Sequence, residues 1–186
     1  VERLRTRASS EPRLRVLEAI GNRSAGRNVA IRAARHEIIA GTDAGVEVEA
    51  AWLERILAPF ERDSAVDVVA GFYRTEGTTP FERAAGILSA PSLAEVRPER
   101  FLPSTRSIAF RRDAWAKVGG FDEALLFAED TKFGLLLKSA GARFAFARDA
   151  IVVWRPRADL GSFFRQNSRY GFGDGEGRIQ GWLYLT

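Results

Sequence analysis

At 186 residues, with 46% hydrophobic residues and a mean hydropathy of -0.16, the chain is long enough for one domain with a buried core. It contains no cysteine, which excludes disulfides and thiolate metal sites, and no apolar run is long enough to span a bilayer. The net charge of +4 comes mostly from scattered arginines without a recognised nucleic-acid motif. Nucleic acid is therefore not an expected partner, whereas the positive charge favours contact with an anionic membrane face.

The first half of the chain alternates predicted strands and helices. Ser24 is placed to cap a helix over residues 25–35, and the apolar run at residues 38–42 predicts a strand buried on both faces. Apolar side chains at helical spacing predict a core-facing helix over residues 52–60. Two further strands are predicted from alternation at residues 13–18 and from β-rich composition at residues 66–73.

The second half continues this pattern after an irregular stretch. Residues 75–103 contain four prolines, and their length indicates an insertion that covers a substrate. Residues 143–147 and 151–154 read as strands, and residues 158–170 as an amphipathic helix with Leu160, Phe163 and Phe164 inward. Glycine-rich residues 171–175 read as a mobile loop. Strands that alternate with helices predict an α/β sandwich.

An acidic pair, Glu129-Asp130, precedes a segment with helical spacing that ends at Gly141. The two carboxylates therefore lie at a loop-to-helix junction, where the helix dipole favours their ionised form. A fixed carboxylate in this place suits a general base. Helix capping alone is the competing interpretation, because acidic residues are common in first turns.

Several segments around this pair occur in an order that resembles family 2 glycosyltransferases of the GT-A fold. They are residues 26–34 (GRNVAIRAA), 38–45 (IIAGTDAG), 52–55 (WLER), 107–112 (SIAFRR), 119–130 (GGFDE to ED) and 166–170 (QNSRY). The resemblance implies a GT-A-like (Rossmann-like) three-layer α/β sandwich with a mostly parallel central sheet. It also implies that residues 1–186 form a single catalytic domain without the family's opening strand and nucleotide-binding loop. The apolar run at residues 181–186 leaves the other end open.

The resemblance also implies roles for individual residues. Asp130 would be the catalytic base, with Glu129 beside it, and Asp43 would hold the nucleotide-sugar donor. The segment that contains Arg27 and Asn28 would line the nucleotide side of the site. The residues of the last motif, Gln166, Arg169 and Tyr170, would contact the acceptor or the diphosphate. The loop predicted at residues 171–175 would close over the donor.

Two departures from the family concern the metal. In the family the second aspartate of the DxD motif binds a divalent cation, and this chain has Gly45 there; a histidine common in relatives is replaced at Trp154-Arg155. One interpretation is that Arg155 contacts the diphosphate and supplies the charge of the missing Mg²⁺ or Mn²⁺. The other is that Asp43 binds the metal with help from Glu47 or Glu49. Both remain open.

The resemblance thus implies transfer of a sugar from a nucleotide-diphosphate sugar to an acceptor hydroxyl, with inversion. The resemblance implies a carbohydrate or lipid-linked acceptor, a role in polysaccharide or glycolipid assembly, and a cytoplasmic site at the inner membrane face. Two alternatives remain. One is a nucleotidyltransferase on a similar sheet. The other is a non-catalytic carbohydrate-binding module derived from the fold, which the missing metal ligand favours and the retained Glu129-Asp130 pair argues against.

Overall fold

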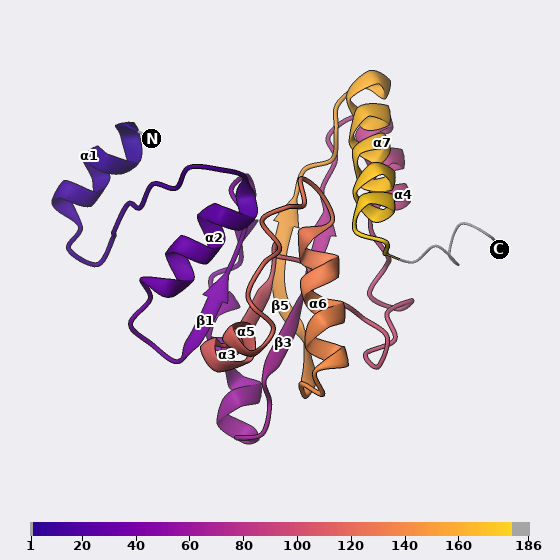
Figure 1. Ribbon diagram of the computed structural model, residues 1–186. Coiled ribbons are helices and arrows are strands. Elements are labelled where there is room, and N and C mark those ends of the chain that lie inside the picture. The colour runs from indigo at the N-terminus through magenta and orange to yellow at the C-terminus, as the bar shows by residue number, and fades with distance from the viewer. Residues whose placement is uncertain (1, 180–186) are drawn as a thin grey trace.

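The computed structural model describes residues 2–179, which fold around one five-stranded sheet (Figure 1). The apolar run at residues 181–186 lies outside the described residues. Across the sheet the strand order is β1-β4-β3-β5-β2. The strands span Ile38–Gly41 (β1), Val46–Val48 (β2), Val68–Thr75 (β3), Ile108–Arg111 (β4) and Phe144–Trp154 (β5).

The sheet is mixed, which corrects the expectation of a mostly parallel one. Only β3 and β5 are adjacent and parallel, while β4 runs antiparallel to both β1 and β3, and β2 runs antiparallel to β5. The sequence of β4 does not show whether it runs parallel or antiparallel to its neighbours, because a short apolar strand has the same pattern in either direction. Its direction matters for function: the residues just before β4 lie beside the carboxyl ends of β1 and β3.

Helices cover both faces of this sheet, as a three-layer sandwich requires. Alternate residues of β3 point to opposite faces, so that Val68 belongs to one core and Val69 to the other. The first core packs against α2 (Arg23–Arg32), α5 (Arg112–Lys117) and α6 (Glu129–Ser139). The second core packs against α3 (Trp52–Arg62), whose Trp52, Ile56 and Phe60 form the buried stripe that the sequence predicts.

The remaining helices lie outside these layers. The helix α1 (Glu2–Ser10) buries no side chain, and Figure 1 shows it at the end of the molecule beyond α2. At the other end, α4 (Pro80–Ser89) and α7 (Leu160–Glu176) lie side by side, joined by an edge-to-face contact of Phe81 with Phe163. No helix of the described residues has the length and apolar character needed to cross a membrane.

Helix limits follow from local chemistry. Asn22, rather than Ser24, caps α2: its side-chain oxygen accepts from the backbone N–H of Ala25 at 3.1 Å, and Ser24 lies inside the helix. The helix α6 begins after Ala128, which has φ 57°, and ends before Gly141, which has φ 78°. The latter is the helix stop that the sequence predicts.

Other predictions need correction. Residues 13–18 form no strand, and residues 38–42 give the edge strand β1, which is only partly buried. The two strands expected at residues 143–154 are one strand, β5, with a register shift opposite Gly71. Residues 171–175 are helical, so the predicted loop is wrong. Of the predicted inward face of α7, Phe163 is half-buried against Phe81, whereas Leu160 and Phe164 are 69% and 70% exposed.

Candidate active site

A cleft of about 320 Å³ opens where β1 and β3 end, β4 begins and α6 starts. Both predicted carboxylates, Asp43 after β1 and Asp130 at the start of α6, line it. Part of its wall comes from the stretch between β3 and β4, through Ser89, Leu102 and Pro103. Ligand sites in open α/β sheets lie beyond the carboxyl ends of strands, and this cleft has that position.

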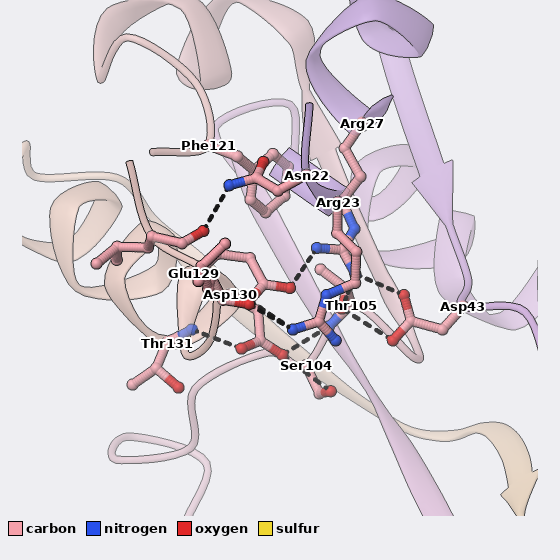
Figure 2. Close-up of polar contacts among 12 residues, drawn as sticks. Asn22, Arg23, Arg27, Asp43, Ser104, Thr105, Phe121, Glu129, Asp130 and Thr131 are labelled. Carbon is pink, nitrogen blue, oxygen red and sulfur yellow. Dashed lines mark hydrogen bonds and ion pairs between the residues drawn. The ribbon is translucent and has the colours of Figure 1, made fainter. Parts of the chain in front are cut away.

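Arg27 on α2 links the two sides of the cleft. Its Nη1 donates to Glu129 at 2.6 Å, and its Nη2 donates to Asp43 at 2.8 Å and to the hydroxyl of Thr105 at 3.0 Å (Figure 2). The Thr105 hydroxyl in turn donates to the other oxygen of Asp43 at 3.1 Å. The guanidinium therefore fixes Asp43 relative to α6, and its planar fork suits this double contact.

Glu129 and Asp130 are adjacent in sequence but have different surroundings. Glu129 is 4% exposed and pairs with Arg27 and, at 3.4 Å, with Arg23. Its carboxylate is thus occupied by two guanidinium groups. Asp130 faces the cleft, and no cationic side chain among residues 2–179 is bonded to it. Adjacent residues on a helix do not point the same way, so one carboxylate can be structural while its neighbour faces a ligand.

Asp130 is held by neutral donors. Oδ1 accepts from the backbone N–H of Thr131 at 2.9 Å, and Oδ2 lies 3.3 Å from the Ser104 hydroxyl and 3.4 Å from the N–H of Thr105 (Figure 2). Burial raises the pKa of the Asp130 carboxyl above its usual range, and the charge of Glu129 adds to this; the positive charge of Arg106 opposes it. The result is a carboxylate that is more basic than an exposed aspartate.

Arg106 is a cation of the cleft that ring contacts and hydrogen bonds hold in place. Its guanidinium lies 4.7 Å from the centre of the Trp154 ring and 5.0 Å from that of Tyr73. It donates to the Ser104 hydroxyl at 3.0 Å and to the Tyr170 hydroxyl at 3.2 Å. Two aromatic faces and two hydrogen bonds fix its position before any ligand binds.

Not all predicted residues reach the cleft. Tyr170 lines it, whereas Gln166 and Arg169 line a separate pocket beside it. Asn28 lies in the core, where its side chain bonds to the backbone of Phe121 at 2.8 and 3.0 Å. Arg155 is exposed and lines neither cavity.

The residues near Asp43 do not fit a divalent cation held by the protein alone. Within residues 2–179 no three acidic or histidine side chains come together in a metal-binding group. Both oxygens of Asp43 are engaged by Arg27 and Thr105, and Gly45 offers no carboxylate. Of the two substitutes, Glu49 pairs with Arg55 at 3.2 Å and Glu47 lies on β2; neither lines the cleft.

Sequence reasoning missed Arg23 and the tripeptide Ser104-Thr105-Arg106, all of which line the cleft. The tripeptide reaches the site because β4 is antiparallel to its neighbours, so its amino end meets the carboxyl ends of β1 and β3. The available signal was a polar run directly before an apolar strand. Only the antiparallel direction of β4 places that run at the cleft.

Comparison with known proteins identifies relatives for most of this chain. The profile of glycosyl transferase family 21 matches residues 27–171. The pre-mycofactocin glycosyltransferase of Mycobacterium tuberculosis is 31% identical over 157 residues, which cover 80% of this chain and 33% of that protein. The uncharacterized glycosyltransferase EpsJ of Bacillus subtilis is 27% identical over 159 residues, with 80% and 46% coverage. The chain thus spans between a third and a half of these relatives.

Solved structures confirm the GT-A-like fold that the sequence resemblance implied. The mannosyltransferase PcManGT from Pyrobaculum calidifontis, in complex with GDP-Man and Mn²⁺, superposes with a TM-score of 0.66 at 22% identity. The match covers 96% of this chain and 51% of that one. GalNAc-T7 with UDP, GalNAc and Mn²⁺ gives a TM-score of 0.59 at 15% identity, with 86% and 36% coverage. The matching profile is that of family 21 rather than family 2, while the fold and the glycosyltransferase class agree with the expectation.

Proposed function

Because the chain belongs to glycosyltransferase family 21, we propose that it forms the catalytic part of an enzyme that transfers a sugar from a nucleotide-diphosphate sugar to an acceptor hydroxyl. The observation that carries this proposal is that Asp43 and Asp130 line one cleft at the carboxyl edge of the sheet. The donor's nucleotide is uridine or guanosine diphosphate by analogy with the two structural neighbours, which contain UDP and GDP-Man.

In the proposed reaction Asp130 takes the proton of the acceptor hydroxyl. The hydroxyl oxygen then forms a bond to the anomeric carbon, and the bond from that carbon to the diphosphate oxygen breaks, its electron pair leaving with the nucleoside diphosphate. In-line displacement inverts the configuration. The raised pKa of Asp130 supports this role, because a general base works best when its pKa approaches the working pH. Glu129 is a positioning residue, since it holds Arg27.

On the donor side we assign Asp43 and Arg27. A second cavity of about 320 Å³ adjoins the cleft and shares Thr105 with it; Arg27, which donates to the Thr105 hydroxyl, lines the second cavity. Its other walls are mostly apolar and come from α2, β1 and β4, for example Ile31, Ile39 and Ile108. A flat nucleoside suits an apolar cavity of this kind, with its diphosphate directed toward the cleft. Arg27 would then lie between the two halves of the donor.

The leaving diphosphate needs positive charge, and Arg106 is better placed than Arg155 to supply it. Arg106 lines the cleft and is already fixed, whereas Arg155 is exposed outside it. Arg106→Ala should lower kcat by about 10²–10³-fold, the usual effect of removing one fixed charge-stabilising group. Arg155→Ala should be silent, and activity should survive EDTA. Loss of activity in EDTA with recovery in Mn²⁺ would instead show that the donor brings a metal.

The setting implied by the sequence resemblance remains part of the proposal: polysaccharide or glycolipid assembly at the inner membrane face, with a carbohydrate or lipid-linked acceptor. Exposed apolar side chains on α4 and α7 support membrane contact; they are Ile87, Leu88, Leu160, Phe164 and Phe172. Co-sedimentation with anionic lipid vesicles tests it, and protein that stays in the supernatant would count against it.

Asp130→Asn is the direct test of the reaction. The substitution keeps the shape of the side chain but removes the base, so release of nucleoside diphosphate from UDP- and GDP-sugars should fall by about 10²–10⁴-fold. Binding of UDP or GDP, measured by calorimetry, should change little. The matched control is Asp113→Asn in the first turn of α5, outside the cleft. If Asp130→Asn retained activity within a few-fold of the control, Asp130 would be a helix cap and not a base.

A further inference from the structure

A second polar pocket, of about 250 Å³, lies beside the cleft, between α7 and the loop before α6. It shares Arg23 and Tyr170 with the cleft. We call it the arginine pocket, because four of its eight lining residues are arginines. They are Arg23, Arg157, Arg165 and Arg169, and the other four are Phe127, Ser162, Gln166 and Tyr170.

The charge of the arginine pocket is compensated only in part, by Glu129 beside Arg23 and by Asp159, whose charge acts on Arg165. None of its lining residues is acidic, whereas the cleft itself contains Asp43, Glu129, Asp130 and Asp174 together with two arginines. Within residues 2–179, Arg157, Arg165 and Arg169 form no ion pair with a carboxylate, and Arg23 shares Glu129 with Arg27. Arg23 and Arg169 instead lie over the ring of Phe127, 5.6 and 5.9 Å from its centre. Like charges gathered around one cavity repel each other unless an anion occupies it.

A buried donor points to the same conclusion independently. Gln166 is 6% exposed, and its Oε1 accepts from Nε of Arg157 at 2.6 Å, which fixes the orientation of the amide. Its Nε2 is buried and has no hydrogen-bond partner among the described residues. Leaving a buried N–H donor unsatisfied is costly, so such a group in a cationic pocket indicates a missing acceptor.

We propose that the arginine pocket binds a phosphate group carried by the acceptor substrate. Guanidinium groups bind phosphate through paired, charge-assisted hydrogen bonds, and the Gln166 amide supplies a further donor. This inference rests on the proposed transferase function, which it deepens by giving the acceptor a chemical class: a hydroxyl compound that bears a phosphate monoester or diester.

The position of the pocket favours the acceptor over the donor as the source of the phosphate. Phe127 of the pocket wall is three residues before Asp130, the proposed base, so the pocket adjoins the base side of the cleft. The two features assigned to the donor lie elsewhere: Asp43 is not among the residues of the arginine pocket, and the apolar cavity shares no residue with it. An acceptor anchored by its phosphate in the pocket would extend past Tyr170, and its hydroxyl would enter the cleft at Asp130.

Inorganic phosphate is the probe for the test, with binding to the whole protein measured by calorimetry at low ionic strength. The wild type should bind it, and Arg165→Gln should weaken binding about tenfold or more, as expected for loss of one charge-assisted contact. Arg148→Gln is the matched control, since Arg148 is exposed and lines neither cavity. Equal affinity in all three proteins, or no binding to the wild type, would overturn the proposal.

Gln166→Glu separates ligand binding from a structural role. The side chain keeps its size, and its new carboxylate can pair with Arg157, so the melting temperature should not fall. Phosphate binding should nevertheless be lost, because the pocket now supplies its own anion. A variant that melts lower and still binds phosphate would show that Gln166 only supports the fold.

A competition experiment distinguishes the two sources of phosphate. Saturating UDP or GDP should leave phosphate binding unchanged if the pocket belongs to the acceptor. If either nucleotide displaces phosphate, the pocket takes the donor's diphosphate and the acceptor assignment is overturned. These measurements need no turnover, so their failure is distinguishable from failure of the proposed reaction, which the Asp130→Asn assay tests.

Discussion

At the scale of single residues, Asp130 combines two requirements that oppose each other. A base must be ionised to accept a proton, yet burial disfavours the charged form and raises its pKa. The structure moderates the conflict with the N–H of Thr131 and the nearby charge of Arg106, both of which favour ionisation. An ionised carboxylate at this buried position lowers the stability of the folded protein, and a base in the cleft requires that loss.

This conflict predicts that Asp130→Asn stabilises the protein at neutral pH. Because the pKa of Asp130 is raised in the folded state, its contribution to stability is full below the unfolded pKa, close to 3.8, and is lost as the pH rises through the folded pKa. The variant should therefore have a higher melting temperature than the wild type at pH 8. In a chain of this size, each kcal/mol gained in the free energy of unfolding raises the melting temperature by about 2–4 °C.

Thermal unfolding measured at a series of pH values checks this prediction. The gap between the two melting curves should close as the pH falls below about 3.8, where the wild-type carboxyl becomes neutral in the unfolded state as well as in the folded one. Asp113→Asn, at an exposed position, should show no such gap. A lower melting temperature for Asp130→Asn at pH 8 would show that the ionised carboxylate stabilises the fold.

At the scale of elements, the structure shows which parts of the site the sequence could predict. Asp43 directly follows the apolar run of β1, and Asp130 begins the helix α6, whose spacing is clear; together with the family resemblance, these positions predicted that both residues face one cleft. The prediction that Asn28 lines the site beside Arg27 was wrong. Adjacent residues on a helix point in different directions, so Arg27 points toward Asp43 and Glu129 while Asn28 points into the core.

Long-range pairing accounts for the other errors. The direction of β4 is set by its neighbours, so the tripeptide at residues 104–106 could not be assigned to the site. The helix α7 continues through Gly171, Gly173 and Gly175 to its C-cap at Gly177, against the low helix propensity of glycine. One of these, Gly173, packs so closely on Phe127 that a Cβ would lie 2.6 Å from it, so tertiary contact explains at least this glycine.

The cap of α4 gives a prediction at this scale. Glu82 completes a capping box: its Oε2 accepts from the hydroxyl of Thr78 at 2.6 Å and from the backbone N–H groups of Thr78 and Thr79 at 2.7 and 2.9 Å. These bonds, led by that from the Thr78 hydroxyl, lower the pKa of Glu82 to about 2. The lowered pKa means that the cap contributes stability above pH 4.5, and that this contribution is lost as the pH falls through about 2.

Glu82→Gln should therefore lower the melting temperature at pH 7, because a neutral amide accepts weaker hydrogen bonds than a carboxylate. The difference from the wild type should shrink as the pH falls from 4.5 toward 2. Circular dichroism melts over this range measure it, with Glu54→Gln in the exposed first turn of α3 as the control. A difference that stays constant down to pH 2 would mean that the charge of Glu82 does not matter.

At the scale of the whole molecule, stability and function are concentrated between α2 and α7. The two cores and all three cavities of the proposed site draw their residues from position 23 onward. Before that point, residues 2–20 bury no side chain fully, and α1 projects beyond α2 at the end of the molecule (Figure 1). Burial of apolar surface is the main source of stability, so this segment contributes little of it.

Deletion of residues 1–12 should accordingly change the melting temperature by less than about 2 °C, which corresponds to less than about 1 kcal/mol in a chain of this size. Arg15 would remain to donate to the carbonyl of Ala33. Ile56→Ala in α3 supplies the contrast: this side chain is wholly buried, and its truncation should cost about 2–5 kcal/mol. If the deletion lowered the melting temperature as much as Ile56→Ala does, the amino-terminal segment would be part of the folded core rather than an appendage to it.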